Sequence, residues 1–587
     1  MQIILALSIL ILSLKAHGVM VRNFPQTITQ PKGQVIHCFV SGDEYFSWLH
    51  DKDNFTLVQN PKTGYYCYAI NQDGELVASS YIVGLDNPVA AGLQPNVQLS
   101  MEHISKNGYL SSQDEPDKTD LRPKSGKDES QRTLNNIVIY IRFSDQDEFD
   151  AKQVKYTNYF NSTADGANSM INYFLEASYQ KLKIISSFYP TNNGNNILSY
   201  QDSHTRNYYC PWTLKNDSGY SVSDAGKMMR GRKSKLIGNA IRYIENQLPS
   251  TVDLDTDKDG KVDNICFIVR GNWEIPKAPN TTFLWPHSYR WYENSELRLG
   301  SKLVVRYNFQ IEDYLDYKQN GVLCHEMFHT LGGGDLGRYD SRPVGPWDLM
   351  AEPWNPPQSM CADYKYRYGR WIDSIPKITL SGHYVLHPIT SASNNCYSIA
   401  SSKKSEYFIF EFRQKAGTFE TSIPGTGLII YRIDQSECCQ NDNPDPTLNW
   451  IYIYRPDGTN KSDGKILEAN FDALVGRSAF HNSTNPNCLL SDGSLGEIYI
   501  KNIQVAGDTV SFDVRFCNLP DEVLVSATSP LPAIANAKKK IETSGPVLIK
   551  NTDHVILEAG QQIILNPGFE VQPGGQFETN INSCGKQ

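Results

Sequence analysis

The stretch from Gly321 to Asp335 constrains the fold of this chain more than any other. It reads Gly-Val-Leu-Cys-His-Glu-Met-Phe-His-Thr-Leu-Gly-Gly-Gly-Asp and contains the pattern His-Glu-x-x-His. On a helix, His325 and His329 lie four residues apart and therefore on one face, so both imidazoles can reach one zinc ion. Glu326, one position round the helix, addresses a water at the same ion. The spacing predicts a helix that carries the metal site of a peptide-bond hydrolase.

A third ligand is expected just beyond this helix. Three glycines, 332 to 334, permit a left-handed helix end and a sharp turn that would bring Asp335 back to the metal. Two imidazoles and one carboxylate leave a fourth position open for water, as a catalytic zinc requires. Glu352 is the alternative third ligand, as a glutamate from a following helix, but three prolines in the next five residues disfavour a helix there. The sequence favours Asp335.

Residues 325–340, His-Glu-Met-Phe-His-Thr-Leu-Gly-Gly-Gly-Asp-Leu-Gly-Arg-Tyr-Asp, followed by Val-Gly-Pro-Trp-Asp-Leu-Met at 344–350, resemble the immune inhibitor A family of secreted bacterial zinc metalloproteases, which are related to the metzincins. The resemblance implies an aspartate as third zinc ligand, which falls on Asp335. It implies a catalytic role for Glu326.

The resemblance also places Met350 in a turn beneath the zinc, as a support for the site. No tyrosine stands two residues after Met350, so the sequence leaves open whether Tyr364, Tyr366 or Tyr368 assists the oxyanion. His287 lies in another segment that resembles the family, and we interpret it as structural.

A second metal signal precedes the histidine pair. Asp255, Asp257 and Asp259 alternate along the chain, Gly260 suits a tight turn, and Asp263 follows, so hard oxygen ligands can converge on calcium. The loop is not a complete EF-hand, because its twelfth position is a cysteine and the next residues predict a strand. The resembling family has such a loop at this point. A solvated acidic turn is the alternative, and we favour structural calcium.

The composition predicts a large exported protein with several domains. The chain has 587 residues, a net charge of -9 and no basic run, which argues against a nucleic-acid partner. Residues 1–18 predict a signal peptide, with a short apolar run from Ile3 to Leu14 and small residues at Ala16 and Gly18. No other long apolar segment occurs, so no transmembrane segment is expected. Export would permit disulfides among the twelve cysteines, whose connectivity the sequence does not give.

We predict a multidomain α+β fold in which a metzincin-like mixed α/β catalytic domain joins a small β-rich propeptide, a C-terminal β-sandwich and a small terminal β module. Helices are expected at 167–181 and 224–246, and strands at 137–143, 265–269, 406–412, 427–433 and 510–514. The boundaries are 1–18 for the signal peptide, 19–132 for the propeptide with a cleavable linker, 133–375 for the catalytic domain, 376–517 for the β-sandwich, and 518–587 for the terminal module.

Two of these assignments have alternatives. Residues 19–132 would otherwise be a small permanent β-domain. The terminal module resembles a coat-hanger stack, a β module appended to secreted bacterial proteins, and both surface attachment and inert packing fit it. Glu406 and Glu411 in the β-sandwich flank no histidine pair, and we interpret both as structural.

The resulting hypothesis is a secreted zinc metalloendopeptidase that acts on protein or peptide substrates and is made as a zymogen. A zinc-activated water would attack the peptide bond, with Glu326 as its general base. Asp43, Cys38 and Cys67 are candidate blocking ligands in the propeptide. The alternative is a calcium-stabilised extracellular binding or adhesion protein with a degenerate protease domain. The intact Glu326 favours catalysis.

Overall fold

The structure, a computed structural model, is mainly β: strands make up 38% of it and helices 17%. The strands form eight separate sheets within the described residues. The expected α+β organisation with a metzincin-like mixed α/β catalytic domain is therefore wrong. Short strands fill all the flanking regions, whereas the longer helices are confined to residues 153–330. The described residues are 17–18, 21–42, 47–72, 75–98, 131–191, 194–210, 216, 218–220, 225–272, 284–291, 296–337, 341–437, 450–459, 462–516, 521–526, 531–532, 534–537 and 539–581.

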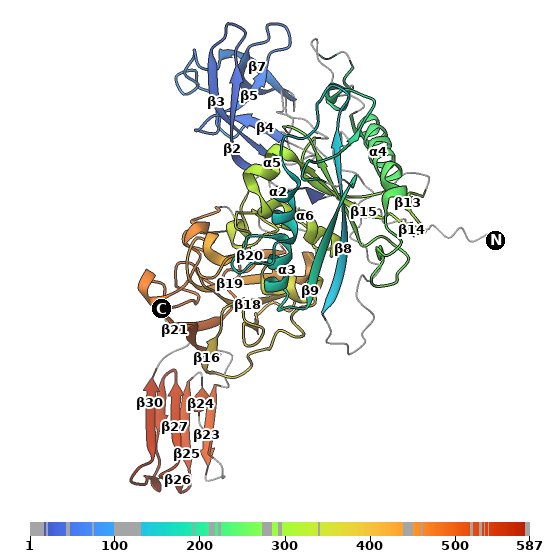
Figure 1. Cartoon of the computed structure of the whole chain (residues 1–587). Coiled ribbons are helices and arrows are strands. Elements are labelled where there is room, and N and C mark those ends of the chain that lie inside the picture. Colours follow the sequence, from blue (N-terminus) through green and yellow to red (C-terminus); the bar gives the residue numbers. More distant parts are fainter. Residues whose placement is uncertain are drawn as a thin grey trace, which may run out of the picture.

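The N-terminal region is a six-stranded antiparallel sheet in which the strands follow one another in chain order (Figure 1). Side chains alternate between the two faces of a strand, and one face of this sheet buries apolar residues such as Val40, Leu49 and Leu57. Most of the predicted signal peptide and of the predicted linker lies outside the described residues. The strands are β2 (Val21–Thr29), β3 (Val35–Gly42), β4 (Ser47–His50), β5 (Thr56–Gln59), β6 (Tyr66–Gln72) and β7 (Glu75–Ile82).

The central region is built on a seven-stranded sheet, ordered β1-β12-β15-β11-β8-β10, with β9 also paired to β8. Strands β8, β11 and β15 run parallel, and β12 runs antiparallel to β15. The sheet consists of β1 (His17–Gly18), β8 (Arg132–Arg142), β9 (Leu182–Tyr189), β10 (Tyr200–Gln201), β11 (Asn264–Val269), β12 (His287–Arg290) and β15 (Arg306–Ile311).

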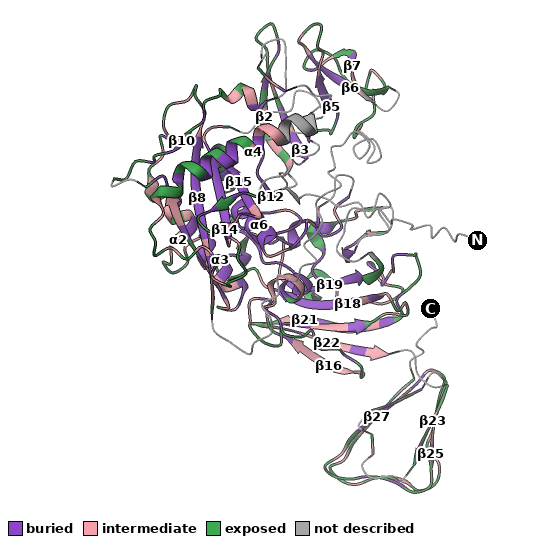
Figure 2. Ribbon diagram, turned by 90° about the vertical axis from the view of Figure 1, so that its right-hand side faces the viewer, coloured by how far each residue is buried: buried purple, intermediate pink, exposed green. Residues whose placement is uncertain are grey.

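Helices cover both faces of this sheet (Figure 2). Helices α2 (Gln153–Asn161), α3 (Met170–Ala177) and α6 (Asn320–Thr330) share a core with Val138 and Ile268 on one face. The opposite face, which carries Ile139 and Phe267, shares a core with α4 (Ala225–Ile244). The strands are buried on both faces because the residues alternate between the two cores. Helix α5 (Glu312–Lys318) follows β15 and leads into α6.

Two packed sheets follow. One has the order β16-β22-β21 and the other β17-β18-β19-β20, and they share a core that includes Phe410 and Phe512. The strands are β16 (Gly382–Leu386), β17 (Cys396–Ala400), β18 (Glu406–Arg413), β19 (Gly427–Asp434), β20 (Ile451–Ile453), β21 (Ile498–Ala506) and β22 (Thr509–Phe516).

The C-terminal module consists of three parallel sheets that form a triangular prism (Figure 2). Ile534 pairs with Ile556 and Val547 with Phe569, a repeat of 22 residues, whereas the first turn is shorter because Glu522 pairs with Lys540, 18 residues on. An ion pair of 2.6 Å joins Arg515 of β22 to Glu558 of this module. The strands are β23 (Glu522–Ser526), β24 (Ile534–Ala537), β25 (Lys540–Ser544), β26 (Val547–Ile549), β27 (His554–Ala559), β28 (Gln562–Ile564), β29 (Phe569–Val571) and β30 (Gln576–Ile581).

None of the helices in the described part of the chain combines the length and apolar character needed to cross a membrane. The eight cysteines that the structure describes are all buried: Cys38, Cys67, Cys210, Cys266, Cys324, Cys361, Cys396 and Cys488.

Candidate metal centre

Helix α6 carries the histidine pair through the middle of the central core. All of its residues are buried, and the backbone of Trp354 approaches Gly321 so closely that a Cβ there would clash with the Trp354 carbonyl. The helix ends where Gly332 takes a left-handed φ of 94° and donates its N–H to His329 O at 2.9 Å. A left-handed residue stops a helix and redirects the chain, so this glycine starts the turn that returns Asp335 to the histidines.

Three donor atoms meet at the end of this turn. The Nε2 atoms of His325 and His329 lie 3.2 Å apart, and Asp335 Oδ1 lies 3.0 Å from the first and 3.6 Å from the second. Donors that share a tetrahedral zinc at about 2.0 Å are about 3.3 Å apart. The three spacings therefore fit one zinc ion, and these residues form one of two candidate metal-binding groups within the described residues. We call His325, His329 and Asp335 the donor triangle.

Backbone carbonyls fix the orientation of both imidazoles. Nδ1 of His325 lies 2.9 Å from Leu349 O, and Nδ1 of His329 lies 2.7 Å from Gly333 O. A carbonyl can only accept a hydrogen bond, so each Nδ1 carries the proton and each Nε2 presents its lone pair to the centre. Metal-binding histidines use the same arrangement, in which the second nitrogen donates to a carbonyl or carboxylate. The donor triangle is thus already oriented for a cation.

Glu326 is fully buried next to the first histidine. Its backbone carbonyl accepts a hydrogen bond of 2.7 Å from Asn308 Nδ2, while Asn308 Oδ1 accepts one of 2.7 Å from Asn264 Nδ2. Asn264 also donates to Asn136 Oδ1 at 2.7 Å and accepts from the Thr330 hydroxyl at 2.9 Å. A row of buried asparagine side chains therefore crosses β8, β11 and β15. It is hydrogen-bonded to α6 at Glu326 and at Thr330.

The sequence analysis did not identify this amide row. Its signal was present, because Asn136 and Asn264 directly precede the apolar runs of β8 and β11, and Asn308 lies within β15. An amide inside a buried strand must find partners, since an unsatisfied buried polar group is costly. The three positions could have been interpreted as contacts to a covering helix.

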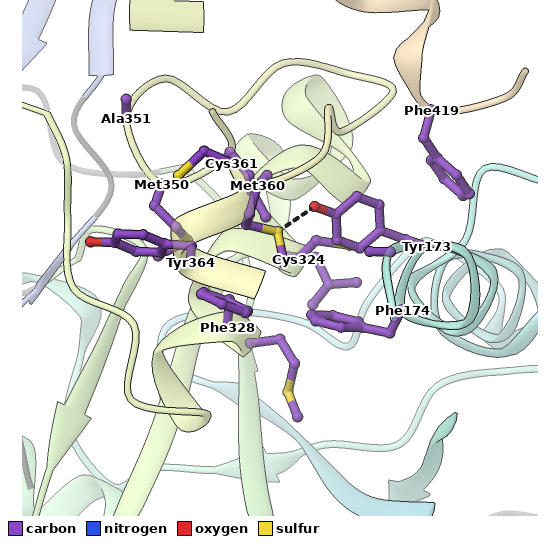
Figure 3. Close-up of a cluster of buried hydrophobic side chains, with 14 of the residues drawn as sticks. Tyr173, Phe174, Cys324, Phe328, Met350, Ala351, Met360, Cys361, Tyr364 and Phe419 are labelled. Atoms are coloured by element: carbon purple, nitrogen blue, oxygen red, sulfur yellow. Dashed lines mark hydrogen bonds between the residues drawn. The ribbon is translucent and has the colours of Figure 1, made fainter. Parts of the chain in front are cut away.

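Met350, which the resemblance places in a turn beneath the zinc, directly follows Leu349, whose carbonyl accepts the hydrogen bond from His325 Nδ1. It is fully buried, its N–H donates to Asp348 Oδ1 at 2.7 Å, and its carbonyl accepts from Leu336 N at 2.8 Å. Figure 3 shows it beside Cys361 and Tyr364 in the core cluster. The turn therefore supports both His325, through Leu349 O, and the segment that follows Asp335.

Glu352, the alternative third ligand, lies outside the donor triangle. Its carboxylate is held by Arg342, at 2.6 and 2.5 Å, and by Arg22 of β2 at 3.5 Å. His287 is likewise outside it: the Nδ1 of His287 lies 2.7 Å from Trp285 O, its ring stacks on Phe309, and burial lowers its pKa well below the usual range. These contacts agree with a structural role for His287.

The three candidate tyrosines occupy different positions. Tyr364 is buried, and its hydroxyl donates to Gly334 O at 3.0 Å, so it holds the backbone next to Asp335. Tyr366 is 42% exposed. Tyr368 packs against Tyr364 with ring centroids 5.0 Å apart and lies over Gly332 at the end of α6. Tyr364 and Tyr368 therefore both lie against the glycine turn that follows α6.

The aspartate loop forms the second candidate group, from Asp255, Asp257 and Asp263. Asp259 instead pairs with Lys261 at 2.9 Å. Asp255 is fully buried, and although burial opposes it, hydrogen bonds from Lys302 and from the Gly260 N–H lower its pKa.

Basic side chains already form ion pairs with the carboxylate oxygens of this loop that would bind a cation. The Lys302 ammonium lies 2.6 Å from Asp255 Oδ2, and Arg132 lies 2.8 Å from Asp257 Oδ2. Burial raises the pKa of Asp263, whose Oδ2 accepts from Asn135 N at 3.0 Å. A calcium ion would have to compete with these donors.

Comparison of the sequence with protein-family models finds no match, and comparison with curated proteins finds none.

Proposed function

We propose that this chain is a zinc-dependent endopeptidase. The observation that carries the proposal is the donor triangle, whose atoms are spaced 3.0, 3.2 and 3.6 Å apart and whose neighbour in the chain is a buried glutamate. Two imidazoles and one carboxylate are the ligand set of many catalytic zinc sites, which keep one position open. The resemblance of residues 325–340 and 344–350 to the immune inhibitor A family supports the same function.

Each residue has a distinct task in this mechanism. His325, His329 and Asp335 hold the zinc, which, when bound, supplies Lewis acidity toward a peptide carbonyl and a water. Glu326 takes the proton of the attacking water and passes it to the leaving amine. The amide of Asn308 keeps the backbone of Glu326 in place.

We also propose that the chain is exported and that its N-terminal region keeps it latent. Arg22 at the start of β2 donates to Ser341 O at 3.1 Å and pairs with Glu352, and both residues belong to the segment whose Leu349 carbonyl holds His325. Phe24 packs against Tyr317 of α5, with ring centroids 4.6 Å apart. These contacts support a domain that covers the site until the linker is cut.

Two blocking ligands considered from the sequence have little support. Cys38 and Cys67 lie within the N-terminal sheet, and burial raises the pKa of Cys38 to about 11 and also raises the pKa of Cys67. A thiolate is therefore disfavoured at both positions at neutral pH. Asp43, the third candidate, lies outside the described residues.

The aspartate loop is proposed to bind calcium as a structural ion. Asp255, Asp257 and Asp263 supply the gathered oxygens. The loop also carries Thr256, whose hydroxyl donates to Thr133 O at 2.7 Å in the first residues of β8. Calcium there would tie the start of the central sheet to the loop before β11.

Metal removal tests the proposed enzyme activity. The linker-cleaved protein is incubated with casein before and after treatment with a chelator, and again after zinc is restored. Hydrolysis that stops on chelation and returns with zinc is the expected result. Hydrolysis that survives complete removal of zinc would exclude the proposed chemistry.

A further inference from the structure

The sheet β17-β18-β19-β20 packs on two different cores. Side chains alternate across a strand, so one face of β18 and β19 packs in the core of the β-sandwich and the other packs in the core that contains α6 and Met350. The residues on the sandwich side are Phe408, Phe410, Phe412, Leu428 and Ile430, and those on the side of the metal centre are Tyr407, Ile409, Ile429, Tyr431 and Ile433.

The face toward the metal centre also carries two buried charges, Glu411 and Arg413. The Arg413 guanidinium forms two hydrogen bonds of 2.7 Å with the Glu420 carboxylate. It also donates to the Trp347 carbonyl and, at 3.2 Å, to the Ser359 carbonyl. The arginine thus binds the backbone at both ends of the segment that contains Met350.

The two carboxylates accept hydrogen bonds from the backbone at the end of this segment and just after it. Glu411 Oε2 accepts from Ala362 N at 2.8 Å and from the Tyr431 hydroxyl at 2.9 Å. Glu420 Oε1 accepts from Ser359 N at 2.7 Å. We call Arg413, Glu411 and Glu420 the sandwich clamp.

The segment held by the sandwich clamp also accepts a hydrogen bond from His325 of the donor triangle. Arg413 holds Trp347 O, and two residues later Leu349 O accepts the hydrogen bond from His325 Nδ1 at 2.9 Å. Between them, Asp348 accepts from Met350 N and from Cys361 N, each at 2.7 Å, which closes the turn on itself. The carbonyl that orients His325 therefore lies two residues after the carbonyl that Arg413 binds.

Apolar contacts follow the same route. Phe419, one residue before Glu420, packs edge-on against Tyr173 of α3 at a centroid distance of 5.3 Å. The Tyr173 hydroxyl points to the sulfur of Met360 at 2.8 Å (Figure 3). Burying charged groups costs desolvation free energy, so a buried ion cluster such as the sandwich clamp adds little to stability. Positioning of the turn that contains Met350 explains the sandwich clamp better.

From these contacts we infer that the β-sandwich is part of the catalytic unit, and that Arg413 and Glu411 are positioning residues that orient His325 through Leu349 O. The catalytic unit then extends from Arg132 to Phe516 instead of ending before β16. This inference rests on the proposed zinc function of the donor triangle. Loss of a residue that orients a metal ligand typically lowers metal affinity or activity by about 10- to 100-fold.

The experiment compares full-length, linker-cleaved variants after zinc is replaced by cobalt. Arg413→Met removes the clamp, Arg413→Lys restores a cation, and Arg432→Met is the control. Arg432 is also a buried arginine of this sheet, but it lies on the sandwich side, where it donates to Leu489 O at 3.1 Å. Glu411→Gln keeps the side-chain shape and serves as a second clamp variant if Arg413→Met does not fold.

The readouts are the visible spectrum of bound cobalt, competition for zinc with a chelator, and kcat and KM for a peptide. The clamp variants should change the cobalt spectrum and lower zinc affinity or kcat by about 10- to 100-fold with little change in KM, and Arg413→Lys should recover part of the loss. Arg432→Met should leave all of these as in the wild type.

Two outcomes would overturn the inference: a folded clamp variant with the wild-type cobalt spectrum and kcat, or an equal loss in Arg432→Met. A wild-type protein that binds zinc and hydrolyses nothing would instead refute the proposed enzyme function, because the cobalt spectra report on the clamp without any turnover.

Discussion

Lys365 offers a quantitative test of the charged junction between the central core and the β-sandwich. It is fully buried, and its Nζ lies 3.2 Å from Ile389 O and 3.3 Å from the Tyr179 hydroxyl. Burial lowers its pKa from 10.5 to about 8, with Arg413 acting in the same direction and Glu420 opposing it. The unfolded chain keeps the higher value, so between about pH 8 and 10.5 it binds a proton that the folded chain has lost.

This difference destabilises the folded protein at low pH. The gap between the two pKa values corresponds to about 3 kcal/mol of unfolding free energy below pH 8, and the loss is recovered as the pH rises toward 10.5. Between pH 7 and 9.5 the recovery amounts to about 2 kcal/mol. Lys365→Met removes the titration, so the stability of this variant relative to the wild type should fall by about 2 kcal/mol over the same interval.

The assay is urea-induced unfolding of both proteins at several values between pH 7 and 9.5. Groups that titrate in the same way in both proteins cancel when the unfolding free energy of the variant is subtracted from that of the wild type at each pH. Lys403→Met is the control: burial lowers the pKa of Lys403, but the hydrogen bond to Glu406 outweighs it and leaves the pKa raised, so Lys403 stays charged throughout this range. A difference between Lys365→Met and wild type that does not change with pH would refute the reasoning.

Asp335→Ala should lose zinc, as measured by metal content after dialysis, whereas Glu352→Ala should retain it, and the reverse pattern would move the third ligand to Glu352. Calcium should raise the melting temperature of the wild type but not of Asp257→Ala, because a ligand that binds only the native state stabilises it; an unchanged response would refute the aspartate loop as the site. Arg22→Ala should raise peptide hydrolysis by the uncleaved chain, since its contacts to Ser341 and Glu352 are lost. Equal activity of this variant and the uncleaved wild type would show that the Arg22 contacts do not keep the chain latent.

The sequence was sufficient to place the donor triangle because its geometry is local. A four-residue spacing on a helix puts His325 and His329 on one face, and Gly332 ends that helix where Asp335 can return. Helix positions were also predictable, since residues 167–181 contain α3 and 224–246 contain α4. These features depend on contacts within about twenty residues.

The fold class and the support of the site could not be obtained in this way. The mixed α/β expectation gave weight to the helices of the central region, whereas short strands dominate the chain. Glu411 was interpreted as structural because it flanks no histidine, but the sequence did not show that its partner is the backbone of Ala362, 49 residues away. Arg413 reaches Trp347, 66 residues away. Such contacts are set by how sheets pack, which no local pattern encodes.

Glu326→Ala provides the most direct test of the proposed enzyme. The wild type and the variant, both cleaved in the linker, are assayed together for zinc content and for hydrolysis of a peptide substrate. We expect about one zinc per chain in both proteins, because Glu326 is not a ligand, and a loss of hydrolysis of about 100-fold or more in the variant, as for removal of a general base. Wild-type hydrolysis by zinc-loaded Glu326→Ala would contradict the account.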